Sequence, residues 1–199
     1  MKIRSATFVK SGVRPADFPA DDLPEVAFAG RSNVGKSSLM NCLMQRRNLV
    51  RVSNTPGRTQ LLNWFNVNDQ LLLCDLPGYG FARAPEHVRR NWGAMIETYL
   101  ERRENLLAIA ILVDVRRGFE DDDLQLLHAA GQFNLQPILV VTKCDKLSRN
   151  ALFNRRHAIA RDLGTDPDRD MVFFSSLSGD GRDLLWKRIA GLLPGVENT

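Results

Sequence analysis

The feature that most constrains the fold is a regular alternation between short apolar runs and segments with helical periodicity. The apolar runs have the length of buried strands and cover residues 25–30, 61–67, 70–76, 106–115, 137–145 and 170–176. The clearest helical pattern lies in residues 86–103, where the residues on one face are Val88, Trp92, Met95, Ile96, Tyr99 and Leu100. Strands that alternate with helices predict an α/β fold, here a mostly parallel six-stranded sheet with helices on both faces.

One pair of predicted strands departs from the parallel arrangement. Only the polar pair Asn68 and Asp69 separates residues 61–67 from residues 70–76, and so short a turn joins antiparallel strands. We therefore expect one antiparallel strand at an edge of the sheet. Residues 2–9 are compatible with a further strand.

The length of the chain favours one domain. Its 199 residues, of which 44% are hydrophobic and 25% charged, can bury one sizeable core. We expect a single domain over residues 1–199, with residues 1–23 as an N-terminal extension and residues 194–199 as a frayed tail.

The sequence shows no pattern of an exported or membrane-spanning protein. The first ten residues lack an apolar core, and the longest apolar run, residues 106–113, is far shorter than the ~20 residues that a bilayer requires. Cys42, Cys74 and Cys144 form no C-x-x-C pair, so neither a disulfide framework nor a zinc site is indicated. We expect a cytoplasmic protein without membrane insertion.

A glycine-rich motif follows the first of these strands. Residues 30–37, GRSNVGKS, match G-x-x-x-x-G-K-[ST] between a predicted strand and a predicted helix. Glycines let backbone N–H groups converge on phosphate oxygens, and a helix that begins near Lys36 directs its positive end at the same anion. We expect Lys36 to reach the β- and γ-phosphates of a nucleoside triphosphate and the Ser37 hydroxyl to ligate Mg²⁺. The alternative is a glycine-containing turn that binds nothing.

A second motif, DLPG, ends another predicted strand. A carboxylate at the carboxyl edge of a parallel sheet faces the bound ligand, so we expect Asp75 to hold Mg²⁺ through a water. The backbone N–H of Gly78 can approach the γ-phosphate, which makes the following loop sensitive to that phosphate. A lone D-x-x-G is usually a simple turn, but beside a phosphate-binding loop the ligand interpretation is favoured.

Two further loops indicate which base is bound. In TKCD, residues 142–145, the Asp145 carboxylate can accept two hydrogen bonds from guanine N1–H and N2–H₂, and adenine lacks both donors. The alkyl stem of Lys143 can lie over the base. SSLSG, residues 175–179, can place a backbone N–H on guanine O6. The alternatives are a helix cap near Ser148 for TKCD and an ordinary loop for SSLSG.

These four motifs, in this order, resemble the G1, G3, G4 and G5 boxes of Ras-like GTPases over nearly the whole chain. More narrowly, residues 23–41, 55–65 and 75–82 closely resemble the EngB/YihA family of bacterial GTP-binding proteins. The resemblance implies a P-loop GTPase domain in which Thr59 joins Ser37 on Mg²⁺ when GTP is bound. It also implies a role in assembly of the large ribosomal subunit, through contacts to its rRNA and proteins, and in normal cell division and septation.

The resemblance extends the expected nucleotide site to neighbouring residues. For GTP or GDP the set is Gly30, Arg31, Ser32, Asn33, Val34, Gly35, Lys36, Ser37, Ser38, Gly57, Arg58, Thr59, Asp75, Leu76, Pro77, Gly78, Thr142, Lys143, Cys144, Asp145, Ser175, Ser176 and Leu177. Within it, the expected catalytic residues are Lys36, Thr59 and Gly78. The expected Mg²⁺ ligands are Ser37, Thr59 and, through a water, Asp75.

Two residues bear on the rate of hydrolysis. Tyr79 follows D-x-x-G at the position where Ras-like enzymes carry a glutamine that orients the attacking water. An aromatic ring cannot orient water in that way, so slow intrinsic hydrolysis is expected. Asn33 stands where some Era-like GTPases hold K⁺, which could stabilise charge in the transition state. The alternative is that Asn33 merely fits an unusual backbone conformation.

The net charge of +4 and the distribution of arginine suggest a phosphate-rich partner. Arginine doublets occur at residues 46–47, 89–90, 102–103, 116–117 and 155–156. Guanidinium groups match phosphate in bidentate geometry, which suits RNA, although solvated helix faces explain any one doublet more often. The acidic run at residues 120–123 predicts a helix N-terminus in preference to a metal site.

Three functions remain open at this point. The leading one is a monomeric GTP-dependent switch that binds a precursor of the large ribosomal subunit. The second is a signalling or cell-division GTPase whose effector is a protein. The third, a P-loop kinase or ATPase acting on a small molecule, is disfavoured by TKCD.

Overall fold

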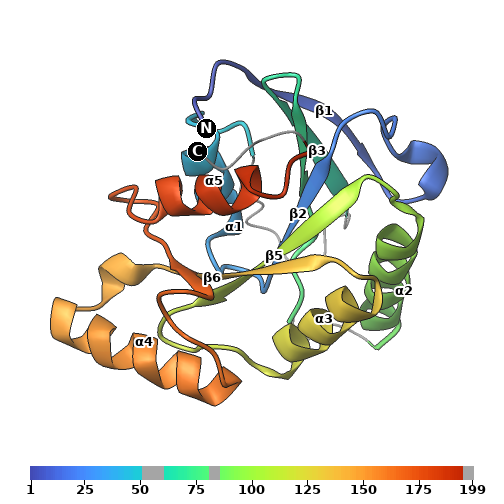
Figure 1. The fold of residues 1–199 in the computed structure, drawn as a ribbon. Helices are drawn as coiled ribbons and strands as arrows, with labels where there is room; N and C mark the ends of the chain where they lie inside the picture. Colours follow the sequence, from blue (N-terminus) through green and yellow to red (C-terminus); the bar gives the residue numbers. More distant parts are fainter. Residues whose placement is uncertain (51–60, 81–85, 195–199) are drawn as a thin grey trace.

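The structure of the chain is a computed structural model that describes residues 1–50, 61–80 and 86–194. A central sheet has the strand order β1-β3-β4-β2-β5-β6-β7 and carries helices on both faces (Figure 1). The strands are β1 (Ala6–Gly12), β2 (Glu25–Gly30), β3 (Leu62–Val67), β4 (Leu71–Asp75), β5 (Leu106–Asp114), β6 (Gln136–Thr142) and β7 (Met171–Phe173). The helices are α1 (Lys36–Leu43), α2 (Glu86–Arg102), α3 (Asp121–Gln132), α4 (Arg149–Leu163) and α5 (Arg182–Ala190), with short 3-10 helices η1 (Pro15–Asp17) and η2 (Cys144–Lys146). The predicted α/β class is confirmed.

The sheet has seven strands, one more than predicted. The additional strand is β1, which pairs with β3 from Ala6 opposite Val67 to Gly12 opposite Leu62. β3 is antiparallel to both β1 and β4, whereas the other pairs are parallel. The antiparallel strand is therefore second in the sheet and not at its edge, because β1 lies outside it.

The predicted turn at Asn68 and Asp69 joins β3 to β4. Both residues have positive φ, at 58° and 54°, a region that asparagine and aspartate tolerate. The Asn68 side chain also accepts hydrogen bonds from the backbone N–H groups of Arg4 and Ser5, at 2.7 and 3.0 Å, and donates to the Lys2 carbonyl at 2.8 Å. The turn therefore fastens the N-terminal segment beside β3.

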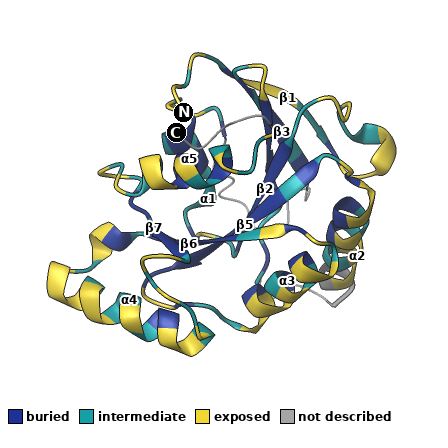
Figure 2. Cartoon of the chain, in the orientation of Figure 1, coloured by how far each residue is buried: buried dark blue, intermediate teal, exposed yellow. Residues whose placement is uncertain are grey.

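Successive strand residues point to opposite faces of the sheet and build separate clusters. Val26 and Phe28 of β2 belong to a cluster with α1 and α5, whereas Ala27 and Ala29 belong to one with α2 and α3. A third cluster lies under α4. Figure 2 shows the buried strands between helices whose outer surfaces are exposed. Because both faces are covered, the central strands have continuous apolar sequences.

A buried ion pair fastens the start of β2 to the end of α2. The side chains of Glu25 and Arg103 are 0% and 1% exposed, and their charged atoms lie 2.7 Å apart. Trp64 Nε1 donates to Glu25 at 3.0 Å, and the Tyr99 hydroxyl donates to the same carboxylate oxygen. Arg103 also donates to the Pro19 carbonyl at 2.7 Å. This cluster lies at the amino-terminal end of β2, opposite to the end that carries the glycine-rich motif.

No helix within residues 1–50, 61–80 and 86–194 is long and apolar enough to cross a bilayer. The three cysteines form no disulfide. Burial raises the pKa of the Cys144 thiol to about 11, so this side chain is a neutral core group next to Asp145.

Candidate functional site

The motifs selected from the sequence lie at one edge of the sheet. β2, β4, β5, β6 and β7 run parallel, so their carboxyl ends share this edge. The loops that meet there are residues 31–35 after β2, 76–78 after β4, 143–145 after β6 and 174–177 after β7. Three of the expected site residues, Gly57, Arg58 and Thr59, lie outside the described residues.

The phosphate-binding loop turns tightly into α1. A β-carbon at Gly30 would lie 2.9 Å from the Leu112 carbonyl oxygen, so only glycine fits there without a shift. Asn33 and Gly35 have φ values of 64° and 104°, and α1 begins at Lys36 as predicted. The first backbone N–H groups of α1 therefore lie at this loop, where they can bind an anion.

Lys36 and Asp75 form an ion pair at the mouth of this loop. The Lys36 ammonium contacts Asp75 Oδ1, and the two side chains are only 11% and 10% exposed. Ser37 follows in the first turn of α1 and is half-buried. The ion pair therefore joins Lys36, which is expected to contact the phosphates, to Asp75, which is expected to hold Mg²⁺ through a water.

The D-x-x-G turn packs directly on the phosphate-binding loop. The Ser32 N–H donates to the Tyr79 carbonyl, and the Leu76 N–H donates to the Phe28 carbonyl, both at 3.0 Å. A β-carbon at Gly78 would lie 3.1 Å from Ser32 Oγ and 3.3 Å from its backbone nitrogen. Gly78 is therefore held beside the loop by a close approach that a larger residue would hinder.

The Tyr79 side chain points away from this loop, into the layer formed by α2 and α3. Tyr79 is 5% exposed, its hydroxyl donates to Asp123 Oδ1 at 2.6 Å, and its ring lies 5.2 Å from that of Trp92. Burial, together with the Asp123 carboxylate, raises the pKa of the Tyr79 hydroxyl far above its usual range. The Tyr79 hydroxyl is thus engaged by Asp123 and its ring is packed against α2.

The acidic run at residues 120–123 begins α3, as predicted, and it also binds the phosphate-binding loop. Arg31 Nη1 lies 3.0 Å from Glu120 and 3.2 Å from Asp122, and its Nη2 lies 3.5 Å from the Gly80 carbonyl. The sequence did not predict these contacts, because carboxylates favour a helix N-terminus whatever else they touch.

Thr142 and Lys143 tie the base-side loop to the phosphate-binding loop. The Thr142 hydroxyl donates to the Val34 carbonyl at 2.7 Å, and the Lys143 ammonium donates to the Asn33 carbonyl at 2.5 Å. A β-carbon at Gly35 would lie 3.6 Å from Lys143 Cε. The alkyl stem of Lys143 therefore runs along the loop, at the place where it can flank a base.

Asp145 is oriented by Ser175, whose hydroxyl donates to Asp145 Oδ1 at 2.8 Å. Ser175 Oγ in turn accepts from the backbone N–H groups of Leu177 and Ser178 at 3.2 and 3.3 Å. The hydrogen bond from Ser175 lowers the pKa of Asp145, so this carboxylate is ionised at neutral pH. The sequence predicted both residues, but not the contact between them.

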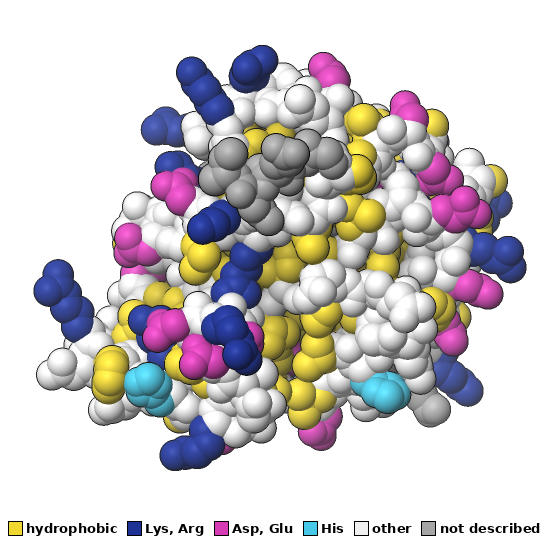
Figure 3. All heavy atoms as spheres, in the orientation of Figure 1, with side chains coloured by type: hydrophobic (Ala, Val, Ile, Leu, Met, Phe, Trp, Pro, Cys, Tyr) yellow, Lys and Arg dark blue, Asp and Glu magenta, His cyan; other side chains and the backbone are white. Residues whose placement is uncertain are grey.

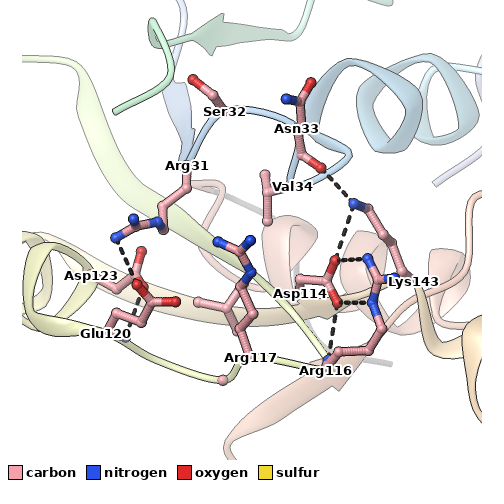
Figure 4. A pocket seen from close by; sticks show the side chains of 12 residues that line it. Arg31, Ser32, Asn33, Val34, Asp114, Arg116, Arg117, Glu120, Asp123 and Lys143 are labelled. Atoms are coloured by element: carbon pink, nitrogen blue, oxygen red, sulfur yellow. Dashed lines mark hydrogen bonds and ion pairs between the residues drawn. The ribbon is translucent and has the colours of Figure 1, made fainter. Parts of the chain in front are cut away.

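A polar hollow of about 210 Å³ lies between the phosphate-binding loop, the end of β5 and Lys143 (Figure 4). Asp114 accepts from Arg116 Nε at 2.9 Å and from Nη2 at 2.6 Å, and it lies 3.1 Å from the Lys143 ammonium. The Arg116 guanidinium holds the pKa of Asp114 well below its usual range. Asp114 thus positions Lys143. It was missed in the sequence, although it ends an apolar strand as Asp75 does.

Known proteins share this arrangement of motifs. Residues 25–143 match a family model described as "50S ribosome-binding GTPase". A protein of Geobacter metallireducens named "Probable GTP-binding protein EngB" is 53% identical over 97% of this chain and 94% of its own length. A protein of Geotalea daltonii with the same name is 50% identical over 98% of this chain and 93% of its own. The chain belongs to the EngB family. The resemblance noted in the sequence is thereby confirmed, and this EngB protein is a GTP-binding switch protein that hydrolyses GTP to GDP and phosphate.

Solved structures agree on the fold. A crystal structure of an EngB protein has a TM-score of 0.69 at 24% identity and covers 84% of this chain and 97% of its own. Era of Aquifex aeolicus, bound to GDP and aluminium fluoride, has a TM-score of 0.66 at 26% identity and covers 88% of this chain and 58% of its own. The fold of the chain is therefore that of a GTPase domain.

Proposed function

We propose that this EngB protein acts as a GTP-dependent switch in the assembly of the large ribosomal subunit and is needed for normal cell division and septation. The description of the matching family, a 50S ribosome-binding GTPase, supports the ribosomal partner. A more distant relative, Era, has been solved with MgGDPNP and a fragment of 16S ribosomal RNA, at 25% identity to this chain. We further propose that the protein works as a cytoplasmic monomer.

The orientation of the Asp145 carboxylate is the observation that favours guanine over adenine as the bound base. Its carboxylate is ionised and oriented by Ser175, while the stem of Lys143 lies on the phosphate side of the same loop. Guanine N1–H and N2–H₂ can both donate to this carboxylate. Adenine would leave it without a donor, and sites built around a specific hydrogen bond reject such analogues strongly.

We propose that the Mg²⁺ of the nucleotide is held by the Ser37 hydroxyl and by Asp75 through a water, with Thr59 joining when GTP is bound. Carboxylate and hydroxyl oxygens are ligands that Mg²⁺ accepts, usually together with phosphates and waters. Within the described part of the chain, no group of three or more His, Cys, Asp or Glu could hold a metal. The donor set therefore fits a cation that arrives with the nucleotide. When bound, Mg²⁺ would neutralise charge on the phosphates.

We propose that Lys36, Thr59 and the backbone N–H of Gly78 stabilise the charge that develops on the phosphates during hydrolysis. The Tyr79 side chain, bound to Asp123, provides no group to orient the attacking water. Intrinsic hydrolysis should therefore be slow, and a partner is expected to complete the site.

The Lys36–Asp75 ion pair suggests how nucleotide binding can change the loop after Gly78. In the structure these two buried side chains neutralise one another. Phosphate oxygens compete for Lys36, so Asp75 must find new hydrogen bonds when the nucleotide binds. Asp75 begins the DLPG turn that packs on Ser32, and its movement is expected to reach the loop after Gly78.

The experiment is co-sedimentation with large ribosomal subunits and their precursors, in a non-hydrolysable GTP analogue and in GDP. We expect the protein to travel with the particles in the analogue and to dissociate in GDP. Absence from the particles in both states would favour the alternative, a signalling or cell-division GTPase with a protein effector.

A further inference from the structure

Three of the five arginine doublets that suggested RNA contain an arginine that is bound by other groups of the fold. Arg103 is buried with Glu25, Arg116 binds Asp114, Arg155 donates to the Val115 carbonyl at 2.8 Å, and Arg156 pairs with Asp168 and lies 4.5 Å from the centre of the Phe173 ring. These arginines therefore have partners within the protein, which differs from the solvated helix faces expected as the alternative to RNA. An RNA-binding surface has to be sought elsewhere.

The outer face of α4 carries such a surface. Arg149, Phe153, His157 and Arg161 follow one another at four-residue intervals, so they share one face of the helix, and all four are exposed. We call these four residues the α4 ridge. Phe153 is 61% exposed, and its ring lies edge-on to His157 with 4.5 Å between the ring centres. Over α4, at the lower left of Figure 3, a hydrophobic side chain lies beside a histidine with Lys or Arg side chains on either side.

The groups around the ridge are those of a polar binding surface. Asn150 and Asn154 are exposed one residue after Arg149 and Phe153, so two amide groups border the ridge. The ion pair that α4 forms within the described residues involves Arg156, on another face, and leaves Arg149 and Arg161 in solvent. The acidic residue of α4, Asp162, stands at its last turn.

A lone exposed phenylalanine needs no ligand, because apolar atoms make up much of any protein surface. What distinguishes Phe153 is its place between two arginines that are exposed to solvent. Arg149 lies one helical turn from it and Arg161 two turns, so the ridge spans about 18 Å of helix. Guanidinium groups bind phosphate, an aromatic ring stacks on an unpaired base, and amides reach base edges. The three kinds of group occur together on this face.

We propose that the α4 ridge binds single-stranded RNA. Phe153 stacks on a base, Arg149 and Arg161 contact phosphates on either side of it, and the neighbouring amides bond to base edges. The inference rests on the proposed function in one respect, because exposed ribosomal RNA is the RNA that the protein would meet.

Other occupants fit this face less well. A helix that lies on an anionic membrane needs a broad apolar face, and the ridge has one apolar residue. A protein partner buries an apolar centre of several residues. Binding to one RNA base requires one aromatic ring, which the ridge provides.

The test is fluorescence anisotropy with a labelled single-stranded RNA of mixed sequence and about 12 nucleotides, using the full chain with GDP. We expect Phe153→Ala to weaken binding about tenfold, the value of one base stack, and Phe153→Tyr to keep parental affinity. Replacing Arg149 and Arg161 together by alanine should reduce the slope of log affinity against log salt by about 1.4, since each phosphate contact on a single strand contributes about 0.7.

Two control variants remove the same chemistry elsewhere. Phe8→Ala removes a phenylalanine that is 51% exposed on β1, and Arg90→Ala removes an exposed arginine on α2. Thermal unfolding and GDP affinity, measured for every variant, should match the parent in the ridge variants because ridge side chains are exposed. Equal RNA affinity for Phe153→Ala and Phe8→Ala would overturn the proposal.

Co-sedimentation with large ribosomal subunits separates this inference from the proposed function. If ridge variants bind both the RNA and the subunits as the parent does, the ridge proposal fails and the function stands. If the parent does not bind subunits but binds RNA through Phe153, the ribosomal function fails and the ridge stands. If ridge variants lose subunits yet keep full affinity for RNA, the occupant is a protein and the proposal is overturned.

Discussion

Replacement of Glu25 by glutamine should destabilise the fold strongly without disturbing the nucleotide site. In the parent, the fully buried carboxylate accepts from Trp64 Nε1 at 3.0 Å and from Arg103 Nε at 2.7 Å. Glutamine keeps the size of the side chain but turns one acceptor into a donor. It also leaves the Arg103 charge, 1% exposed, with the surface residue Asp21 as its ionic partner.

Removal of one partner from a buried ion pair costs about 3–5 kcal/mol. In a chain of this size, each kcal/mol lowers the melting temperature by about 2–4 °C, so we expect Glu25→Gln to melt about 10 °C lower than the parent in a circular-dichroism scan. GDP affinity at low temperature should be unchanged, because Glu25 begins β2 and the nucleotide loops follow its other end, roughly 20 Å away.

The matched control is Glu104→Gln, the same change in an exposed carboxylate next to Arg103, which should cost less than about 0.5 kcal/mol. Combining Glu25→Gln with Arg103→Gln should destabilise by less than the sum of the two single changes, because the pair is coupled. Equal melting temperatures for Glu25→Gln and Glu104→Gln would refute a stabilising role for the buried pair.

Three further predictions concern the site. Tyr79→Phe removes the donor to Asp123 and should lower the free energy of unfolding by about 1.5–3 kcal/mol with single-turnover GTP hydrolysis unchanged; a large loss of hydrolysis would make the hydroxyl catalytic. The Ser175 hydroxyl lowers the pKa of Asp145, so the stability from this carboxylate is present above its unfolded pKa of about 3.9 and is lost as pH falls through the lower folded value. Ser175→Ala removes this hydrogen bond, so as the pH is lowered the variant should begin to lose melting temperature at a higher pH than the parent does. If the parent and the variant lose melting temperature over the same acidic range, the contact is contradicted. A K⁺ site at Asn33 is tested by measuring GTP hydrolysis in KCl and in NaCl at equal ionic strength, with and without ribosomal subunits. Hydrolysis that is faster in KCl, and no longer faster in Asn33→Ala, supports the ion. Identical rates of the parent in both salts contradict it and leave Asn33 with the backbone role that its φ of 64° favours.

The central strands could be predicted because both faces of the sheet are covered. The run at residues 25–30 coincides with β2, and every residue of that strand is buried. The sequence alone could not decide whether the N-terminal segment forms a strand, because β1 is half exposed: the exposed fractions of Phe8 and Val9 are 51% and 41%. The place of β1 in the sheet also depends on pairing with β3, which lies about fifty to sixty residues further along the chain. Local sequence carries no signal for so distant a pairing.

The motif residues could be predicted because phosphate and guanine demand particular groups at strand ends. The contacts between loops could not, since they depend on the order of strands in the sheet. Arg31 meets Glu120 only because the ends of β2 and β5 are adjacent. The sequence marked Tyr79 as a departure from related enzymes, but only the packing of α3 shows that its hydroxyl binds Asp123.

The most direct test of a guanine-specific site is the nucleotide preference set by Asp145. Calorimetry with Mg²⁺ would give the affinities of the parent, Asp145→Asn and the control Asp183→Asn, whose side chain is 94% exposed, for GDP, ADP and xanthosine diphosphate. We expect the parent and the control to prefer GDP over ADP by up to about 10⁴-fold. Asp145→Asn should bind GDP weakly and gain affinity for xanthosine diphosphate, because the C2 carbonyl of xanthine accepts from the asparagine amide. Retained GDP affinity in Asp145→Asn, without a gain for the xanthine nucleotide, would contradict the assignment.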